Sequence, residues 1–167
     1  MNIIILNELH IGVNNNYNKL LKKDKVLRNT FENYSRFATA NYSFYVYDNK
    51  KLIGFFYLIK NYDSIYYELD YGIIDEYRGM GISKLVIDFI NKTDGMPKYV
   101  VAEVKKTNIY ALKSLRNCEF VGTGKYGLNF IDEDEKFETL YFLLNKDVYE
   151  DFQNEYNDYC KKLVLEI

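Results

Sequence analysis

The segment that decides the fold runs from residue 65 to residue 84 and reads IYYELDYGIIDEYRGMGISK. Its first half alternates strictly between two faces, as a β-strand does, so Glu68 and Asp70 share one side of the predicted strand. Glycines follow at 79 and 81, and apolar residues then recur at helical spacing from Leu85 to Ile90. Glycine lets backbone N–H groups converge without interference from a Cβ atom, and a helix N-terminus adds partial positive charge. The segment therefore predicts a strand, an anion-binding loop and a helix.

The loop alone leaves two readings open, because a Gly-x-Gly pair between a strand and a helix is also compatible with a simple tight turn. Two other nucleotide-binding patterns are excluded by their spacing. The loop has no Gly-Lys-Ser/Thr of a P-loop, and the three residues after Gly81 provide no third glycine of the dinucleotide fingerprint.

The rest of the chain alternates strand and helix patterns. We predict strands at 2–6, 42–47, 51–59, 65–74, 99–104 and 138–144 from β-branched, aromatic and alternating residues, with a turn at 132–136 before the last strand. Helical spacing predicts one broken helix or two short ones within 17–40, and helices from about 85 to 95, from Thr107 or Asn108 onward, and at about 147–164 with Asp147 as its cap. The strand, glycine loop, helix, strand order predicts a right-handed βαβ crossover. We expect a single α/β domain over 1–167.

Composition excludes several classes of protein. With 167 residues, 48% hydrophobic and 28% charged, the chain can form a sizeable core and is not expected to be disordered. The formal net charge of -2 argues against general nucleic-acid binding. Two cysteines without Cys or His neighbours at metal spacing exclude a disulfide scaffold and predict no metal site. No secretion signal or membrane-spanning stretch is visible, so we expect a cytoplasmic protein without membrane contact.

Two blocks of sequence together resemble the GNAT superfamily of N-acetyltransferases. The first, residues 68–83, is similar to that family's core strand and its Gln/Arg-x-x-Gly-x-Gly/Ala loop. The second, residues 101–120, is similar to the block in which an Asn, here Asn108, and an Ala three residues later open a helix. The resemblance covers roughly residues 42–144 and implies a mixed, mostly antiparallel central sheet with helices on both faces.

The resemblance also implies acetyl-CoA (coenzyme A) as the cofactor. Main-chain groups of Ile73 and Ile74 would pair with the pantetheine arm, and the Asn108 side chain would bond it, cap its helix, or do both. The Arg78 side chain would add charge near the phosphates or lie solvated on the loop. Backbone amides along the loop would bind the diphosphate, those of Arg78, Gly79, Met80, Gly81, Ile82 and Ser83.

Three positions depart from the family pattern. Glu76 stands where Gln or Arg is usual, Glu119 replaces the glycine before Phe120, and Leu115 stands where the family often has a general-acid tyrosine. Protonation of the departing thiolate would then come from another group or from water, or would not be needed.

Acetyl transfer to an amine requires a neutral nitrogen, so a base must accept a proton from the ammonium group. The candidates are Glu68 and Glu103, ranked equally, with Asp70 behind them. Acidic residues on a strand are usually solvated, outward-facing positions, and an acidic cleft could also simply attract a cationic amine.

Four other residues carry weaker signals. His10 is expected at the surface and Cys118 in the core, while Tyr110 and Tyr126 are possible replacement acids among eighteen tyrosines.

These observations predict an N-acetyltransferase that moves an acetyl group to a primary amine by direct transfer in a ternary complex. The acceptor could be a small-molecule amine, a protein N-terminus or a lysine. Two alternatives stay open: an acetyl-CoA-binding regulatory or interaction module with weak or no turnover, and acetylation of charged tRNA, which the near-neutral charge disfavours. The amphipathic residues from Asp147 onward also suggest a possible homodimer.

Overall fold

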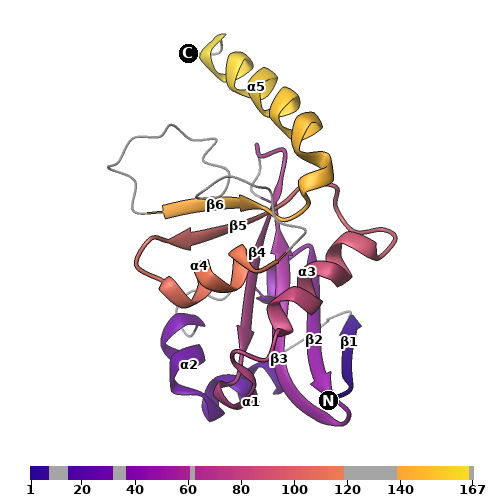
Figure 1. Ribbon diagram of the computed structural model, residues 1–167, viewed down its shortest axis with the longest axis vertical. Helices are drawn as coiled ribbons and strands as arrows, with labels where there is room; N and C mark the ends of the chain where they lie inside the picture. The colour runs from indigo at the N-terminus through magenta and orange to yellow at the C-terminus, as the bar shows by residue number, and fades with distance from the viewer. Residues whose placement is uncertain (8–14, 32–36, 61–62, 119–138, 166–167) are drawn as a thin grey trace. The chain divides into compact units, whose positions relative to one another are not determined.

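The computed structural model describes residues 1–7, 15–31, 37–60, 63–118 and 139–165 (Figure 1). Two compact units share the chain: residues 1–59 with 69–82 form unit 1, and residues 60–68 with 83–167 form unit 2. The elements, in chain order, are β1 (Ile3–Asn7), α1 (Asn15–Lys23), α2 (Lys25–Phe31), η1 (Phe37–Thr39), β2 (Tyr42–Asp48), β3 (Lys51–Ile59), β4 (Tyr67–Ile73), η2 (Asp75–Tyr77), α3 (Ile82–Lys92), β5 (Val100–Lys105), α4 (Ile109–Arg116), β6 (Thr139–Leu143), η3 (Lys146–Val148) and α5 (Tyr149–Leu165).

The strands form one mixed sheet in the order β1-β2-β3-β4-β5-β6. The β1–β2, β2–β3 and β5–β6 pairs are antiparallel, whereas β4 and β5 are parallel, as expected for strands joined through a helix. The predicted fold class, a mostly antiparallel mixed sheet with helices, is confirmed. The parallel register of β4 with β5 covers two residues, Tyr67 opposite Val100 and Glu68 opposite Val101.

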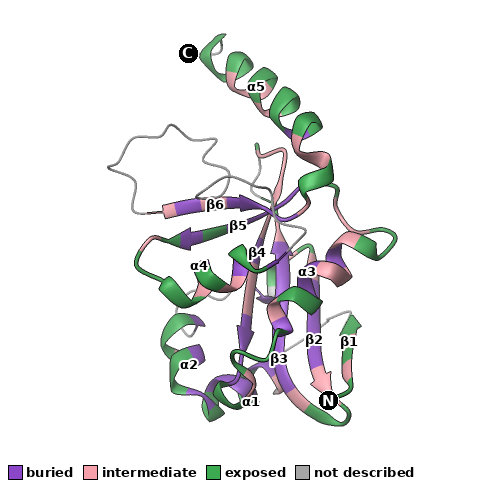
Figure 2. Cartoon of the chain, in the orientation of Figure 1, coloured by how far each residue is buried: buried purple, intermediate pink, exposed green. Residues whose placement is uncertain are grey.

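An aromatic core holds unit 1 together, and Figure 2 marks buried residues, such as those along β2 and β3, in purple. Tyr17 of α1 stacks on Phe37 with ring centroids 4.9 Å apart and meets Phe55 of β3 edge-on at 4.9 Å. Phe31 of α2 meets the same Phe55 ring edge-on at 5.0 Å. Edge-to-face and offset contacts of this kind add stability beyond the burial of apolar area. The short helices are therefore fixed against the middle of the sheet.

Asp24 explains why the helical pattern after Tyr17 divides into two helices. Its Oδ1 atom accepts a hydrogen bond of 3.0 Å from the backbone N–H of Leu27, which satisfies a donor in the first turn of α2. Capping by Asp favours a helix start at this point, and the alternative of two short helices is the one the structure adopts.

Strands β3 and β4 approach each other closely where two glycines face. A Cβ atom at Gly54 would lie 2.6 Å from the Gly72 carbonyl oxygen and 2.5 Å from Ile73 Cδ1. A Cβ atom at Gly72 would lie 2.7 Å from Leu27 Cδ2. Only glycine fits at either position without displacement of its neighbours.

The core of unit 2 joins β5, β6 and α5. Tyr99, Val101, Leu143 and Phe152 form a buried cluster, and the Tyr99 and Phe152 rings meet edge-on at 5.2 Å. The Tyr99 hydroxyl also donates a hydrogen bond of 2.8 Å to Glu155 Oε1. These contacts anchor the start of α5, whereas Leu165 at its other end is 85% exposed.

The prediction of Asp147 as the α5 cap is wrong. Asp147 lies inside the 3₁₀ turn η3, and the side chain of Asn145 caps that turn by accepting a hydrogen bond of 3.0 Å from the Asp147 N–H. Several other predictions lie outside the described residues: the turn at 132–136, the strand residue Glu138, and positions His10, Glu119 and Tyr126.

Across the described ranges, no helix is long and apolar enough to cross a lipid bilayer.

Candidate functional site

The loop that follows β4 has the backbone conformation that its sequence predicts. Gly79 and Gly81 have φ angles of 76° and 80°, in the left-handed region that L side chains rarely adopt. Among the residues that the structure describes, none has an atom within 4 Å of a Cβ atom built at either glycine, so the described part of the chain leaves the space in front of this backbone open. Ile82, 3% exposed, then begins α3. Open backbone at the start of an eleven-residue helix suits an anionic group.

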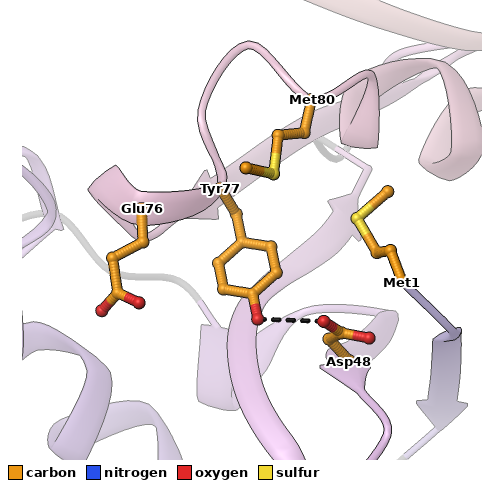
Figure 3. A pocket seen from close by; sticks show the side chains of 5 residues that line it. All are labelled: Met1, Asp48, Glu76, Tyr77 and Met80. Carbon is orange, nitrogen blue, oxygen red and sulfur yellow. Dashed lines mark hydrogen bonds between the residues drawn. The ribbon is translucent and has the colours of Figure 1, made fainter.

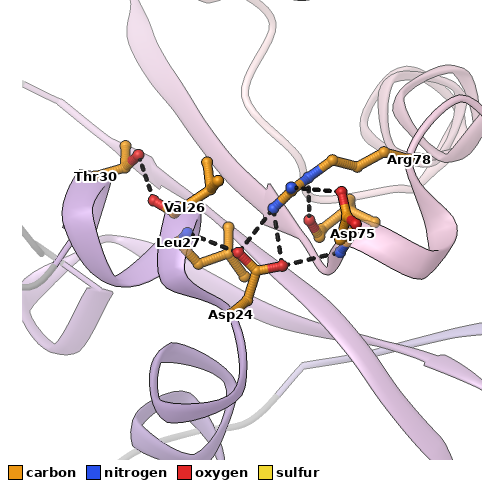
Figure 4. A network of polar contacts seen from close by, with 7 residues as sticks. Asp24, Val26, Leu27, Thr30, Asp75 and Arg78 are labelled. Atoms are coloured by element: carbon orange, nitrogen blue, oxygen red, sulfur yellow. Dashed lines mark hydrogen bonds and ion pairs between the residues drawn. The ribbon is translucent and has the colours of Figure 1, made fainter.

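Arg78 is an exposed residue of this loop, but its side chain is held by two carboxylates. Its guanidinium Nη2 lies 3.0 Å from both carboxylate oxygens of Asp24, and its Nη1 donates to Asp75 Oδ1 at 3.0 Å (Figure 4). Its backbone N–H donates to the Asp75 carbonyl oxygen at 3.1 Å and so belongs to the η2 turn. Both the side chain and the amide of Arg78 thus have partners inside unit 1.

Several main-chain groups at the end of β4 form hydrogen bonds within unit 1. The Ile74 N–H donates to the Ile53 carbonyl oxygen of β3 at 3.0 Å, and the Ile74 carbonyl oxygen accepts from the Tyr77 N–H at 3.0 Å. The Ile73 carbonyl oxygen accepts from Arg78 Nε at 3.0 Å. Because neighbouring residues of a strand direct their peptide groups to opposite edges, the Ile73 N–H faces the edge away from β3.

Glu76, the unusual residue of the loop motif, forms an ion pair with Lys51 at 2.6 Å. It also lines an open pocket of 330 Å³ in unit 1 with Met1, Asp48, Tyr77 and Met80 (Figure 3). Two of these lining residues are joined, because the Tyr77 hydroxyl donates to Asp48 Oδ2 at 3.0 Å. None of the carboxylates proposed as a base lines it.

Two of the three predicted bases, Glu68 and Glu103, belong to unit 2 and lie near tyrosine side chains. Glu103 of β5 is paired in register with Tyr141 of β6, and Glu68 is paired with Val101 two residues before Glu103. Residues opposite each other in register project to the same face of a sheet, so Glu68, Glu103 and Tyr141 share one face.

The phenols near these carboxylates hold their protons strongly. The pKa of Tyr66 is raised to about 12, mainly by burial and also by the charge of Glu68, the Tyr141 phenol and the charge of Glu103. The pKa of Tyr141 is raised by burial and by the charges of Glu103 and Glu68, with a contribution from its hydrogen bond to Glu103. Both phenols are therefore neutral hydrogen-bond donors at physiological pH.

The remaining predicted residues lie in four kinds of position: on a strand, at a helix cap, in the core and at the surface. Asp70 is half-buried on β4 in unit 1. The Asn108 side chain accepts from the Ala111 N–H at 3.2 Å, which confirms the helix cap. Leu115 is 1% exposed and Cys118 is buried, as expected for core residues, whereas Tyr110 is 89% exposed.

Sequence reasoning missed Asp24, Tyr66 and Tyr141. Asp24 stands directly before a helical pattern, so its capping role was readable, but its pairing with Arg78 spans 54 residues. Tyr66 lies two residues from Glu68 in an alternating segment, which is a readable signal. Tyr141 depends on the register between β5 and β6, which no local pattern reveals.

Residues 13–120 match the sequence model of the acetyltransferase (GNAT) family. The chain belongs to the GNAT acetyltransferase family. No curated protein sequence matches it.

Solved GNAT structures share the fold at low sequence identity. A spermidine N-acetyltransferase SpeG chimera from Vibrio cholerae and hSSAT superposes with a TM-score of 0.57 at 19% identity, covering 90% of this chain and 99% of its own. The Campylobacter jejuni N-acetyltransferase PseH gives 0.55 at 21% identity, with 86% and 98% covered. A Bacillus subtilis acetyltransferase in complex with CoA gives 0.55 at 15% identity, with 86% and 98% covered. These similarities show the fold; membership of the acetyltransferase (GNAT) family identifies the protein as an acyltransferase.

Proposed function

We propose that this GNAT protein transfers an acetyl group from acetyl-CoA directly to a primary amine, with both substrates bound together. The loop of Gly79 and Gly81 carries the proposal, because its open backbone at the start of α3 suits a diphosphate. The structural similarity to a CoA-bound acetyltransferase supports the same cofactor.

Most of the groups that would bind acetyl-CoA are backbone amides, and one is a side chain. The amides of Gly79, Met80, Gly81, Ile82 and Ser83 would hold the diphosphate. The Ile73 N–H would pair with the pantetheine arm along β4, whose register with β5 ends at Glu68. Asn108 caps α4 with its side-chain oxygen and would offer its amide N–H₂ to the same arm. When bound, acetyl-CoA supplies an acetyl group activated as a thioester.

Glu68 and Glu103 are the proposed bases, with Asp70 the third candidate. An amine acceptor is protonated at neutral pH, and a carboxylate must take its proton, directly or through a water molecule, before the nitrogen can react. The same two carboxylates would attract a cationic acceptor. The structural similarity to spermidine N-acetyltransferases supports an amine of this kind.

Two tyrosines of unit 2, Tyr66 and Tyr141, could replace the general-acid tyrosine that is missing from α4. Leu115 is packed in the core where many family members have a tyrosine. Tyr66 and Tyr141 remain protonated well above neutral pH and share their surroundings with Glu68 and Glu103. We propose that one of these phenols donates a hydrogen bond or a proton to negative charge that develops during transfer.

Measurement of thiol release from acetyl-CoA, with spermidine, lysine and a peptide N-terminus as acceptors, tests this function. Calorimetry with CoA runs alongside it. We expect CoA binding and turnover with at least one amine. Glu68→Gln or Glu103→Gln should lower kcat by about 10²–10⁴-fold with CoA affinity unchanged. Glu150→Gln, an exposed position on α5, makes the same charge change and should keep the wild-type rate.

Absence of CoA binding would refute the proposal entirely. Binding without turnover on any amine would favour the regulatory module instead, for which the buried Leu115 is the motivating observation. Normal kcat in both glutamate variants would exclude these carboxylates as bases and leave Asp70.

A further inference from the structure

Asp24 carries a charge that is buried inside unit 1. The residue is 7% exposed, and its carboxylate has four hydrogen-bond contacts. Oδ1 accepts from the Leu27 N–H at 3.0 Å, Oδ2 accepts from the Asp75 N–H at 2.9 Å, and Arg78 Nη2 lies 3.0 Å from each oxygen (Figure 4). Burial by itself raises the pKa of Asp24, but hydrogen bonds from Leu27, Arg78 and Asp75 outweigh it, so the net pKa is lowered. The group is therefore a carboxylate at neutral pH.

Arg78 connects three segments of unit 1 through one guanidinium. Besides Asp24 at the start of α2, it binds Asp75 of η2 and the carbonyl oxygen of Ile73 at the end of β4. A planar guanidinium with several fixed acceptors holds its own backbone in place, because each hydrogen bond restricts the same rigid group. The residue so held stands directly before Gly79.

The glycine turn needs such an anchor. Gly79 and Gly81 permit the left-handed backbone that the loop requires, but glycine also has the greatest freedom to leave any one conformation. On one side the turn is fixed by Ile82, which is 3% exposed at the start of α3. On the other side Arg78 is the residue with fixed partners. Gly79, Met80 and Gly81 lie between these two anchors.

The charge of Arg78 is already balanced within the network. Asp24 and Asp75 both pair with it. The neighbouring Glu76 is paired with Lys51. Any affinity of the loop for a diphosphate would then depend on the direction of its amides, and hence on the conformation that the network maintains.

We propose that Asp24 is a positioning residue for the diphosphate loop: it fixes Arg78, and through Arg78 the backbone of residues 79–81, while Arg78 itself does not bind the phosphates. This inference rests on the proposed use of acetyl-CoA. It assigns to the α1–α2 junction a role in cofactor affinity without contact with the cofactor.

In the alternative, Arg78 itself binds the phosphates. The two hypotheses predict different changes in CoA affinity for the substitution Asp24→Asn. Asp24→Asn removes the carboxylate charge and frees Arg78. If Arg78 contacted the phosphates, CoA affinity would rise or stay the same. If Asp24 positions the loop, Asp24→Asn should weaken CoA binding on the order of tenfold, within the usual range for coupling between sites. Arg78→Lys, which keeps the charge but loses the fork of donors, should weaken it to a similar extent.

The experiment compares CoA dissociation constants by calorimetry for wild type, Asp24→Asn, Arg78→Lys and the double variant. Asp94→Asn, an exposed aspartate after α3, controls for the charge change. Because the two residues act as one unit, the double variant should bind within about twofold of the weaker single variant. Thermal unfolding of each variant verifies that it is folded.

A second readout needs no ligand. ¹⁵N relaxation order parameters of Gly79 and Gly81 in the free protein should fall in Asp24→Asn and stay unchanged in Asp94→Asn. Wild-type protein that binds no CoA would refute the proposed function, while the order parameters would still decide whether Asp24 fixes the loop. Should Asp24→Asn not fold, Arg78→Lys decides by the same readout. Unchanged order parameters, an Asp24→Asn affinity equal to or above wild type, or additive losses in the double variant would each overturn the inference.

Discussion

Replacement of Gly54 by alanine provides a sharp test of the packing between β3 and β4. The added methyl group would lie 2.5 Å from Ile73 Cδ1, which can rotate away, and 2.6 Å from the Gly72 carbonyl oxygen, which is backbone and cannot. The hydrogen bond of 3.0 Å from the Ile74 N–H to the Ile53 carbonyl oxygen is formed one residue before Gly54. Relief of the clash therefore requires β3 and β4 to separate where that bond joins them.

The size and the sign of the effect both follow from this geometry. Overpacking of a well-packed core costs about 1–3 kcal/mol, and the upper part of that range applies because backbone is the obstacle. For a chain of this length, each kcal/mol lowers Tm by about 2–4 °C, so Gly54→Ala should lower Tm by roughly 5–10 °C. If the space were open, the same change would stabilise the protein by about 0.4–1 kcal/mol, because alanine restricts the unfolded chain.

Thermal unfolding followed by circular dichroism measures this shift. Gly95→Ala is the comparison, since Gly95 has a φ of 83° and an added methyl group there would meet no atom of the described ranges within 4 Å. It should lose about 1–2 kcal/mol from backbone strain alone. A Tm for Gly54→Ala equal to or above that of the wild type would refute the close approach of the two strands.

Two further predictions concern the loop and the phenols. Gly81→Ala places a methyl group in the open space before the loop and strains a φ of 80°, so CoA affinity measured by calorimetry should fall at least about tenfold; an unchanged affinity would contradict the diphosphate site. Tyr66 keeps its proton to a pKa of about 12 when folded, against an ordinary value of 10.0. The stabilisation that comes from this raised pKa is thus fully present below pH 10 and is lost as the pH rises towards 12. The free energy of unfolding in urea should decline less steeply between pH 9 and 11 in Tyr66→Phe than in wild type, and equal slopes would rule out the shift.

Local patterns were sufficient to predict the elements around the loop. Alternation predicted β4, helical spacing predicted α3, and two capping residues before an apolar stripe predicted that α4 starts at Thr107 or Asn108, of which Asn108 is the cap. Each of these signals depends on residues within a few positions of one another. The cap of the last helical segment was misassigned because Asn145 and Asp147 both have capping side chains, and geometry alone decides between them.

The contacts within the site were harder to predict, for a physical reason. The ion pair of Asp24 with Arg78 joins residues 54 positions apart, and neither residue type specifies its partner. Tyr141 meets Glu103 only because β5 and β6 adopt one register, and a shift of one residue would turn its ring to the other face. Residue types therefore predicted which carboxylates to consider, whereas tertiary pairing determined which phenols accompany them.

The buried position of Cys118 has a practical consequence for enzymology. Burial raises the pKa of this thiol, and its sulfur donates to the Ser114 carbonyl oxygen at 3.3 Å. A disulfide reagent such as Ellman's should therefore react slowly with Cys118 in folded protein, because the thiolate is the reactive form. In a thiol-release assay, only the half-exposed Cys160 should react promptly, which gives a background of one thiol per protein chain. Reaction of a second thiol per chain would indicate that the protein is unfolding during the assay.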